Sequence, residues 1–491
     1  MNSILNEAKL KNLPRPIRNE PIITPKIIHF GPGAFFRSFV ASLLDDINQK
    51  DDEKWGIIGV SLHSEETFNK LVGQDLVFNA LSMSNTKKRV QTISAISDFL
   101  VAKKERHSVL DALSDEQIEI VSLTITEKGY HYNSDKKELD FSNQNVIDDL
   151  GNLENPQTVV GFLVAGLRNR YLSGKAPFTI LSCDNLPNNG AIVKKITTDF
   201  AQKIDTPFAK WISKEVCFPS SMVDRITPAT KDRDILNFAE EYGVYDPALA
   251  VHEEFFQWVI EDKFSSARPK FELAGIQMVS KVELHEKMKL RCLNGTHSAL
   301  AYLGYLAGCK TIAECVTDDS IVNYIKYLWE GEIIPTLETP EGENLNDYCS
   351  NLLKRYQNPA IEHRTWQIAM DGSQKLPQRI LETVSDLLAK QRNFQGLALA
   401  IAAWMKYVTG IDLAGEAIDV RDPLANDFAI LAKKSKTSEQ YVDTLLDQSK
   451  VFPADLSGSS AFRTEIQNSY KLLEQYGSLV SVKKLKIDLE K

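Results

Sequence analysis

The feature that most constrains the fold of this chain is a change of pattern near residue 285. Before it, short apolar runs alternate with stretches whose apolar residues lie three and four positions apart, as in Ser38–Ile47. That spacing is typical of amphipathic helices, and the alternation predicts βαβ units with a largely parallel sheet. The candidate strands are Lys26–Phe30, Trp55–Val60, Glu119–Thr124, Pro177–Cys183 and Ile276–Val282.

From about residue 286 the pattern is helical nearly throughout. Apolar residues mark helix faces at Leu300, Leu303 and Leu306, and again at Leu381, Val384, Leu387 and Leu388. A chain of 491 residues is too long for one compact core. We therefore predict an α/β domain over residues 1–285, followed by a mainly α-helical domain over residues 286–491.

Charge and hydropathy argue against several kinds of partner. The net charge of -9 and the pI of about 5.6 argue against nucleic acid and anionic membranes, since both recruit an excess of Lys and Arg. The most apolar run, Leu397–Met405, is too short to span a bilayer and is followed by Lys406, so it predicts a buried helix. The first sixteen residues contain no apolar signal-peptide core, and we expect a cytoplasmic protein.

The cysteines indicate neither disulfides nor a metal site. They form no CxxC pair and have no metal-ligand spacing, so we expect reduced thiols packed as small hydrophobic side chains. No Cys/His/Glu set of the kind that a zinc-dependent alcohol dehydrogenase needs can be assembled. The six cysteines are Cys183, Cys217, Cys292, Cys309, Cys315 and Cys349.

A glycine-rich turn follows the first candidate strand. Gly31 would permit the tight turn, and Gly33 would let the backbone approach a pyrophosphate at a helix N-terminus. Phe36 occupies the place of the usual third glycine, so a plain strand-to-helix turn remains an alternative. No acidic residue directly ends the next strand, which leaves both NAD and NADP open. The candidate cofactor contacts in this segment are Gly31, Gly33, Ala34, Phe35 and Arg37.

A second candidate site lies between residues 287 and 298. On an α-helix, Lys289, Asn294 and His297 would fall within an arc of about 140°. A carbonyl/alcohol redox site needs a proton donor, neutral donors facing the alkoxide, and a group that orients them. Desolvation and a positive nicotinamide would both lower the pKa of a lysine towards the working pH. A solvated polar helix face is the alternative interpretation.

The segment KLRCLNGTHSALAYLGYLAG, which starts at Lys289, resembles the lysine-centred signature of the mannitol 2-dehydrogenase family of polyol-specific long-chain dehydrogenases/reductases. Further blocks agree in the family's order: IIHFGPGAFFR, SLTITEKGY, SCDNLPNNG, MVDRITP and QWVIEDKF. The resemblance covers nearly the whole chain. It implies a Rossmann-type NAD-binding domain, a helical C-terminal domain, an active site between them, and a sugar acid or polyol as substrate. We expect a monomer or a weak homo-oligomer.

The resemblance also implies roles for single residues. Lys289 matches the general acid/base, Asn294 and Asn185 the donors that hold the substrate oxygen, and His297 the histidine that supports substrate and lysine. The sequence pattern itself supports Asn185, which follows a candidate strand at the sheet edge where α/β ligands bind. Glu127 follows another strand in the same way and is a candidate cofactor contact. The remaining matches are Asp224 and Lys375, which would contact substrate, and Glu286, which would exchange protons beside the lysine. Asp224 could instead be an ordinary turn carboxylate.

The segment from His363 to Arg379 resembles the D-mannonate oxidoreductase (fructuronate reductase) branch of this family. Polyol dehydrogenases of the family tend to have arginine where Gln367 stands. The segment offers cations that could bind a uronate carboxylate, namely His363, Arg364, Lys375 and Arg379. A solvated basic face is the alternative, with mannitol or arabinitol as substrate. The family's usual His-Arg-Ala-His after the glycine loop is replaced by Phe36-Arg37-Ser38-Phe39.

Three other interpretations are less well supported. Tyr171 and Lys175 have the spacing of short-chain dehydrogenases, but Gly174 should end the helix between them. His252 begins a zinc-protease-like pattern without the second histidine. A non-catalytic dinucleotide-binding protein would be favoured had Lys289 or Asn294 been replaced, and both are present.

Overall fold

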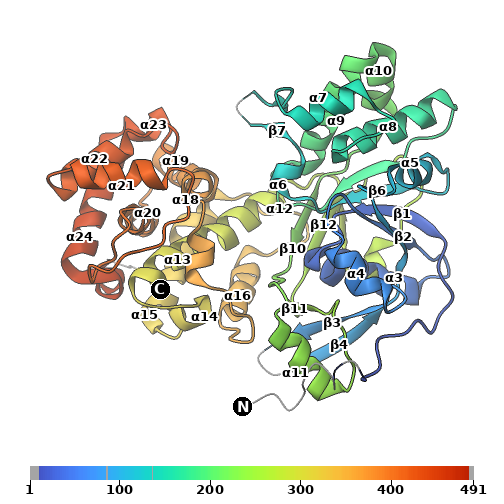
Figure 1. The fold of residues 1–491 in the computed structure, drawn as a ribbon. Coiled ribbons are helices and arrows are strands. Elements are labelled where there is room, and N and C mark those ends of the chain that lie inside the picture. The colour runs from blue at the N-terminus through green and yellow to red at the C-terminus, as the bar shows by residue number, and fades with distance from the viewer. Residues whose placement is uncertain (1–9, 11, 85–86, 135, 486–491) are drawn as a thin grey trace. The chain divides into compact units, whose positions relative to one another are not determined.

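The computed structural model describes residues 10, 12–84, 87–134 and 136–485 (Figure 1). It divides into two compact units, one up to Glu283 and one from Leu284 onward. The first combines sheets with helices and the second is helical, so the predicted fold class is confirmed. The division falls two residues before the change of pattern in the sequence.

The first unit is built on a five-stranded sheet in the order β5-β2-β1-β6-β9, with every neighbouring pair parallel. Both of its faces are covered, because Ile28 and Phe30 enter one apolar cluster while Ile27 enters another. Strands buried on both faces carry nearly continuous apolar runs, which explains why four of them could be predicted. The strands are β1 (Pro25–Phe30), β2 (Gly56–Ser61), β5 (Ile96–Val101), β6 (Ile120–Leu123) and β9 (Thr179–Ser182).

The fifth predicted strand, Ile276–Val282, is present but shorter than predicted. Only Gln277–Val279 is a strand (β13), and helix α12 already begins at Glu283. Strand β13 pairs with β12 in a separate sheet of order β10-β12-β13. A further sheet has the order β11-β3-β4, and β7 pairs with β8. These strands are β3 (Phe78–Met83), β4 (Lys88–Ile93), β7 (Tyr132–Asn133), β8 (Glu138–Leu139), β10 (Ser221–Asp224), β11 (Ala250–Glu253) and β12 (Gln257–Glu261).

Helices cover the parallel sheet on both faces. Residues of α5, α8, α9 and α10 share the apolar cluster of Ile28, whereas those of η1 and α3 share that of Ile27. The segment Ser38–Ile47 is helical as predicted, but its first part belongs to the π-helix η1. The helices of this unit are α2 (Ala34–Phe36), η1 (Arg37–Ala41), α3 (Ser42–Lys50), α4 (Glu66–Val72), α5 (Arg106–Ser114), α6 (Thr126–Gly129), α7 (Gln144–Gly151), α8 (Val159–Leu172), α9 (Asn189–Ile204), α10 (Thr206–Glu215), α11 (Asp232–Tyr242) and the 3₁₀ turn η2 (Phe271–Ala274).

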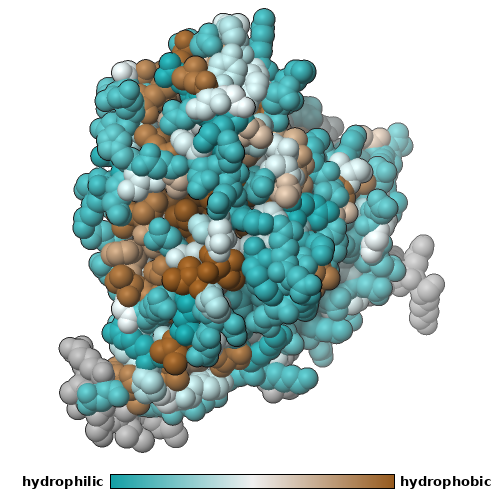
Figure 2. Space-filling model, turned by 90° about the vertical axis from the view of Figure 1, so that its right-hand side faces the viewer, coloured by the Kyte–Doolittle hydropathy of each residue, from teal (hydrophilic) through white to brown (hydrophobic). Residues whose placement is uncertain are grey.

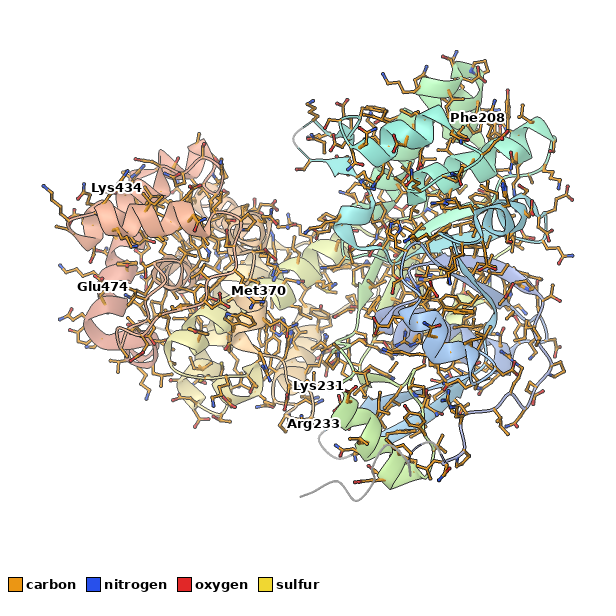
Figure 3. The ribbon with its side chains drawn as sticks, in the orientation of Figure 1. Phe208, Lys231, Arg233, Met370, Lys434 and Glu474 are labelled. Atoms are coloured by element: carbon orange, nitrogen blue, oxygen red, sulfur yellow. The ribbon has the colours of Figure 1, made fainter. Side chains whose placement is uncertain are left out.

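The end of helix α8 lies between Tyr171 and Lys175, the two residues with the Tyr-x-x-x-Lys spacing of short-chain dehydrogenases. Gly174 has a φ of +67°, and α8 ends at Leu172, so the predicted helix end is confirmed. Tyr171 packs against Phe208, which is labelled in Figure 3, while Lys175 donates to the carbonyl of Ser114. The two side chains therefore serve different contacts and do not form a catalytic pair.

The second unit packs its helices around α20 and α13. Every residue of α20 from Gly396 to Met405 is buried, which confirms the buried helix predicted there. The described residues contain no helix long and apolar enough to cross a membrane. Figure 2 shows a face of the first unit, and hydrophilic side chains cover most of that face. The elements are α12 (Glu283–Met288), η3 (Lys289–Gly295), α13 (Thr296–Leu306), α14 (Ile312–Cys315), α15 (Asp319–Tyr327), η4 (Leu328–Ile333), η5 (Ile334–Thr336), α16 (Leu345–Tyr356), α17 (Thr365–Ala369), α18 (Gly372–Leu376), η6 (Pro377–Leu381), α19 (Glu382–Ala389), α20 (Gln395–Tyr407), α21 (Ala425–Lys434), α22 (Ser438–Leu446), α23 (Ala454–Ser457) and α24 (Ser460–Lys484).

Candidate functional site

The glycine turn after β1 is held in place by the neighbouring strands. Gly31 has a φ of +89°, and a Cβ there would lie 2.1 Å from the carbonyl oxygen of Thr124. The Thr124 hydroxyl donates to the Gly31 carbonyl at 2.7 Å, and the Gly31 N–H donates to the carbonyl of Val60. Only glycine fits both this backbone conformation and this close approach. The tight turn expected at Gly31 is present.

Gly33 has a different reason to be glycine. Its φ of -74° suits any residue, it is exposed, and a Cβ would meet only the Gly31 oxygen at 3.9 Å. It is also the N-cap of the helical segment that begins at Ala34, and no side chain caps that end. A helix start without a side-chain cap presents backbone N–H groups to an anion. Packing and backbone conformation alone therefore do not require glycine at position 33.

Arg37 was expected to contact the cofactor, but both of its hydrogen bonds in the structure go to backbone. Its guanidinium is buried and donates to the carbonyls of Pro32 and Ala248. Burial is the main cause that lowers the pKa of Arg37 to about 10, which leaves it charged at neutral pH. Arg37 thus ties the glycine turn to the segment before β11. His29 is neutral, with its pKa lowered to about 3 by burial, and stacks on Phe36.

Three more candidates of the first unit follow strand ends. Asn185 is exposed just after β9, and Glu127 is exposed on α6 just after β6. These two strands are adjacent and parallel, so both residues stand at the carboxyl edge of the main sheet, where α/β ligands bind. Asp224 ends β10 in the second sheet and is only 5% exposed.

The segment from Lys289 to Gly295 is a π-helix, not the α-helix assumed from the sequence. Because hydrogen bonds in a π-helix run from residue i to i+5, the predicted arc of 140° does not apply. Single π-helical turns occur frequently at functional sites, and two further candidates, Arg37 and Arg379, also lie in such turns. His297 belongs to α13, which continues directly from η3.

Side chains from other helices stabilise this irregular turn. Trp329 donates to the carbonyl of Cys292 at 2.9 Å, and the Tyr356 hydroxyl donates to that of Leu293 at 3.1 Å. Thr296 shares the same two carbonyls. These contacts satisfy backbone acceptors that a π-turn displaces from regular pairing. Trp329 and Tyr356 were missed, because nothing in the local sequence near Lys289 points to them.

Like Arg291, which is 2% exposed, Lys289 is a buried cation. It is only 8% exposed, so the solvated face considered from the sequence does not describe it. Lys287 and Arg291 pair with Asp386, at 3.7 Å and 2.6 Å. Glu286, one turn earlier on α12, is half-buried. Lys289 is therefore a buried lysine at the start of η3, and desolvation of this kind favours the neutral form of a lysine.

His297 is neutral at physiological pH. Burial lowers its pKa well below the ordinary value, and the positive charges of Arg355 and Arg379 act in the same direction. Its ring stacks on Tyr356 with centroids 4.8 Å apart and meets the edge of His363 at 4.7 Å. Its Nε2 is buried without a hydrogen-bond partner among the described residues. A neutral imidazole in this state can donate or accept a hydrogen bond.

The four side chains expected to bind a substrate carboxylate differ in charge and in exposure. His363 is not a cation, because burial and then the charge of Arg355 lower its pKa to about 4. Arg364 is exposed and lies 4.0 Å from Glu362. Lys375 donates to the carbonyls of Met370 (labelled in Figure 3) and Ile368, which fix its ammonium.

Arg379 lies beside the segment of Lys289 and His297. Its guanidinium contacts the hydroxyl of Ser298 at 3.3 Å, and a Cβ on Gly295 would lie 2.7 Å from its carbonyl oxygen. Glycine at 295 therefore lets η6 approach η3. Arg355 adds a positive charge near both histidines, and it was missed from the sequence because it lies on α16, outside every motif.

Comparison with known proteins assigns the chain to a family. Residues 25–273 match the family model of the mannitol dehydrogenase Rossmann domain, and residues 281–474 match that of the mannitol dehydrogenase C-terminal domain. The chain belongs to the mannitol dehydrogenase family. The family predicted from the sequence is therefore confirmed, together with its two-part architecture.

Similar proteins match along nearly their whole lengths. An uncharacterized oxidoreductase of Escherichia coli K12, YeiQ, is 40% identical and aligns over 97% of this chain and 98% of its own. D-mannonate oxidoreductase of the same organism is 38% identical over 95% of this chain and 97% of its own. A solved structure of Pseudomonas fluorescens mannitol 2-dehydrogenase, in ternary complex with NAD and D-mannitol, has a TM-score of 0.84. It is 34% identical and covers 98% of each chain.

Proposed function

We propose that the protein is an NAD(H)-dependent, zinc-independent oxidoreductase that interconverts D-mannonate and D-fructuronate. The observation that carries the proposal is the buried Lys289 on a π-helical turn that leads into the neutral His297. Family membership supports the dehydrogenase class, and the similarity to D-mannonate oxidoreductase supports the sugar acid. Lys289 and Asn294 are both present, which argues against a non-catalytic dinucleotide-binding protein.

The first unit suits a dinucleotide. Gly33 leaves room for a pyrophosphate, and the first turn of the helix beyond it presents backbone N–H groups. We propose that the pyrophosphate is bound by the turn of Gly31, Gly33, Ala34 and Phe35. Arg37 holds this turn in place through its hydrogen bonds to the backbone, and Glu127 contacts the cofactor. NAD is the cofactor named for the mannitol 2-dehydrogenase structure. When bound, it supplies or accepts the hydride.

The other groups handle the substrate oxygen and its proton. In reduction, Lys289 donates a proton to the oxygen of the ketone, and in oxidation it takes the proton back. The amides of Asn294 and Asn185 hold that oxygen as its charge develops. His297 orients substrate and lysine through neutral hydrogen bonds, Asp224 binds a substrate hydroxyl, and Glu286 exchanges protons beside the lysine.

The carboxylate is assigned to Arg379 and Lys375. Of the four cations expected from the sequence, these two are fixed by contacts near η3 and η6, whereas His363 is neutral and Arg364 is exposed. We propose that His363 acts through its edge contact with His297 instead. A charge-assisted hydrogen bond contributes about 1.5–3 kcal/mol, so one good contact implies a ten- to hundredfold preference for the charged sugar.

The test compares fructuronate and fructose as substrates with NADH. The two differ chiefly at one end, where fructuronate has a carboxylate and fructose a hydroxymethyl group. We expect kcat/KM to favour fructuronate at least tenfold, and Arg379→Met or Lys375→Met to raise KM for fructuronate more than for fructose. Arg392→Met removes an exposed cation of the same unit and should change neither value. Equal efficiencies, or a preference for fructose, would contradict the uronate assignment.

Oxidation of mannitol or a related polyol is the second candidate. The observation in its favour is the structural similarity to the mannitol 2-dehydrogenase that binds D-mannitol. The same comparison of the two sugars decides between them.

A further inference from the structure

The motif Ser182–Gly190 holds two polar side chains for which the proposed reaction has no use. Asp184 directly precedes Asn185, and Asn189 is fully buried at the start of α9. Neither is expected to touch substrate or cofactor. Their hydrogen bonds reach the loops on both sides of Asn185.

The Asp184 carboxylate holds the loop that follows β6. One oxygen accepts from the Thr126 N–H at 2.9 Å, and the other accepts from the Ile125 N–H at 2.9 Å and the Tyr130 hydroxyl at 2.6 Å. Thr126 has a φ of +64°, a conformation that costs a non-glycine residue free energy and persists only where contacts impose it. Asp184 supplies two of those contacts. The next residue in the loop is Glu127.

Asn189 holds the other side. Its amide nitrogen donates to the carbonyl of Asp184 at 3.0 Å and to that of Ser221 at 2.8 Å, and its oxygen accepts from the Ser221 N–H. Ser221 is the first residue of β10, the strand that ends at Asp224. The loop that carries Asn185 is thus attached to the loop of Glu127 and to the strand of Asp224.

We propose that Asp184 is a positioning residue that, together with Asn189, fixes Asn185 where it can hold the substrate oxygen. This inference rests on the proposed function for the role of Asn185, and on the hydrogen bonds alone for the attachment of the loops. An exposed asparagine on a loop needs such support, because a misplacement of about 1 Å can cost on the order of a hundredfold in rate. Burial raises the pKa of Asp184, while its three hydrogen-bond donors favour the charged form.

The main test is Asp184→Asn, which keeps the size of the side chain. In either orientation the new NH₂ group faces a backbone N–H, of Ile125 or of Thr126, so one of them loses its acceptor. Hydrogen exchange of the segment 124–130 should therefore accelerate. Asp45→Asn is the matched control, because Asp45 is also a buried carboxylate that accepts three hydrogen bonds, from Gln49 and Ser94, and it lies on α3, whose apolar residues join the cluster of Ile27. It should lower thermal stability without changing exchange in 124–130 or kcat.

A double-mutant cycle with Asn185→Ala separates positioning from general destabilisation. We expect Asp184→Asn to lower kcat ten- to hundredfold in the wild type, and less than twofold in the Asn185→Ala background. Tyr130→Phe removes one donor only and is the milder variant, with a smaller loss of the same kind. Equal losses in both backgrounds, or unchanged exchange in 124–130, would overturn the proposal.

The cycle uses whichever of fructuronate and fructose the wild type reduces with NADH. If the wild type reduces neither, or if Asn185→Ala leaves kcat unchanged, the proposed function of that site fails. The exchange measurement still decides whether Asp184 holds the loop after β6.

Discussion

The two glycines of the turn after β1 should respond to the same substitution in opposite ways. Gly31→Ala places a Cβ 2.1 Å from the Thr124 carbonyl oxygen at a φ of +89°. Backbone strain costs about 1–3 kcal/mol and overpacking about 1–3 kcal/mol. The free energy of unfolding should therefore fall by about 2–6 kcal/mol, enough to populate unfolded protein in mild urea.

Gly33→Ala should leave the fold intact and impair cofactor binding. Its φ of -74° accepts alanine, and the nearest atom to the new Cβ lies 3.9 Å away. Substitution at such a site changes stability by about +0.4 to +1 kcal/mol through the unfolded chain. If the pyrophosphate approaches this backbone, the Cβ displaces it and removes a charge-assisted hydrogen bond of about 1.5–3 kcal/mol. The Kd for NADH should then rise ten- to hundredfold.

Urea unfolding measures the first effect, and titration of NADH fluorescence measures the second. Gly151→Ala is the matched control, since Gly151 ends α7 and a Cβ added there would meet no atom within 4 Å. It should raise the free energy of unfolding by no more than about 1 kcal/mol and leave the Kd for NADH unchanged. A Gly33→Ala protein that binds NADH within twofold of wild type would refute the proposal that the pyrophosphate lies against Gly33. A Gly31→Ala protein as stable as wild type would refute the claim that only glycine fits beside Thr124.

Three further predictions concern the proton donor, metals and pH. Lys289→Ala should lower kcat by roughly 10²–10⁴-fold and leave the Kd for NADH unchanged. Lys287→Ala, which removes an exposed ion pair, should keep kcat within twofold of wild type. A Lys289→Ala protein with more than half of wild-type turnover would rule out Lys289 as the proton donor. Activity should survive EDTA and 1,10-phenanthroline, because the described residues contain no group of three or more metal-ligating side chains; a tightly bound zinc whose removal abolishes turnover would overturn the lysine mechanism. Burial raises the pKa of Glu332 from 4.5 to about 7, so the folded state holds its proton more tightly and loses stability as pH rises from about 4.5 to about 7. Relative to Glu332→Gln, the wild type should lose about 3 kcal/mol of unfolding free energy over that range in urea titrations, and a constant difference would contradict the shift.

Much of the fold could be predicted because burial leaves a local signal. Strands β1, β2, β6 and β9 are covered on both faces and are therefore apolar at successive positions. Strand β4 (Lys88–Ile93) was missed, because only one of its six residues is buried and its apolar residues alternate weakly. The strand expected over Ile276–Val282 is shorter than predicted, because apolar content alone does not show where a strand ends.

The candidate site was predictable where a residue type carries its own chemistry. Lys289, Asn294 and His297 are close together in sequence, so their grouping did not depend on the fold. The conformation of their segment did depend on it, since the carbonyls of the π-turn are satisfied by Trp329 and Tyr356 from other helices. No local pattern encodes such distant partners.

The sequence by itself determined the family, the two-part architecture, the glycine turn and the residue types available for proton transfer. Each of these features depends on residues that lie close together in the sequence. The signals are the spacing of hydrophobic residues, the backbone freedom of glycine and the chemistry of single side chains. Only the tertiary structure decided which ionisable side chains are exposed, which are buried and which are neutral. Arg364 remains in solvent, burial lowers the pKa of His363 and of His297, and Lys289 is buried. The physical reason is that desolvation and the field of distant charges depend on what the folded chain places around a group, which its neighbours in sequence do not specify.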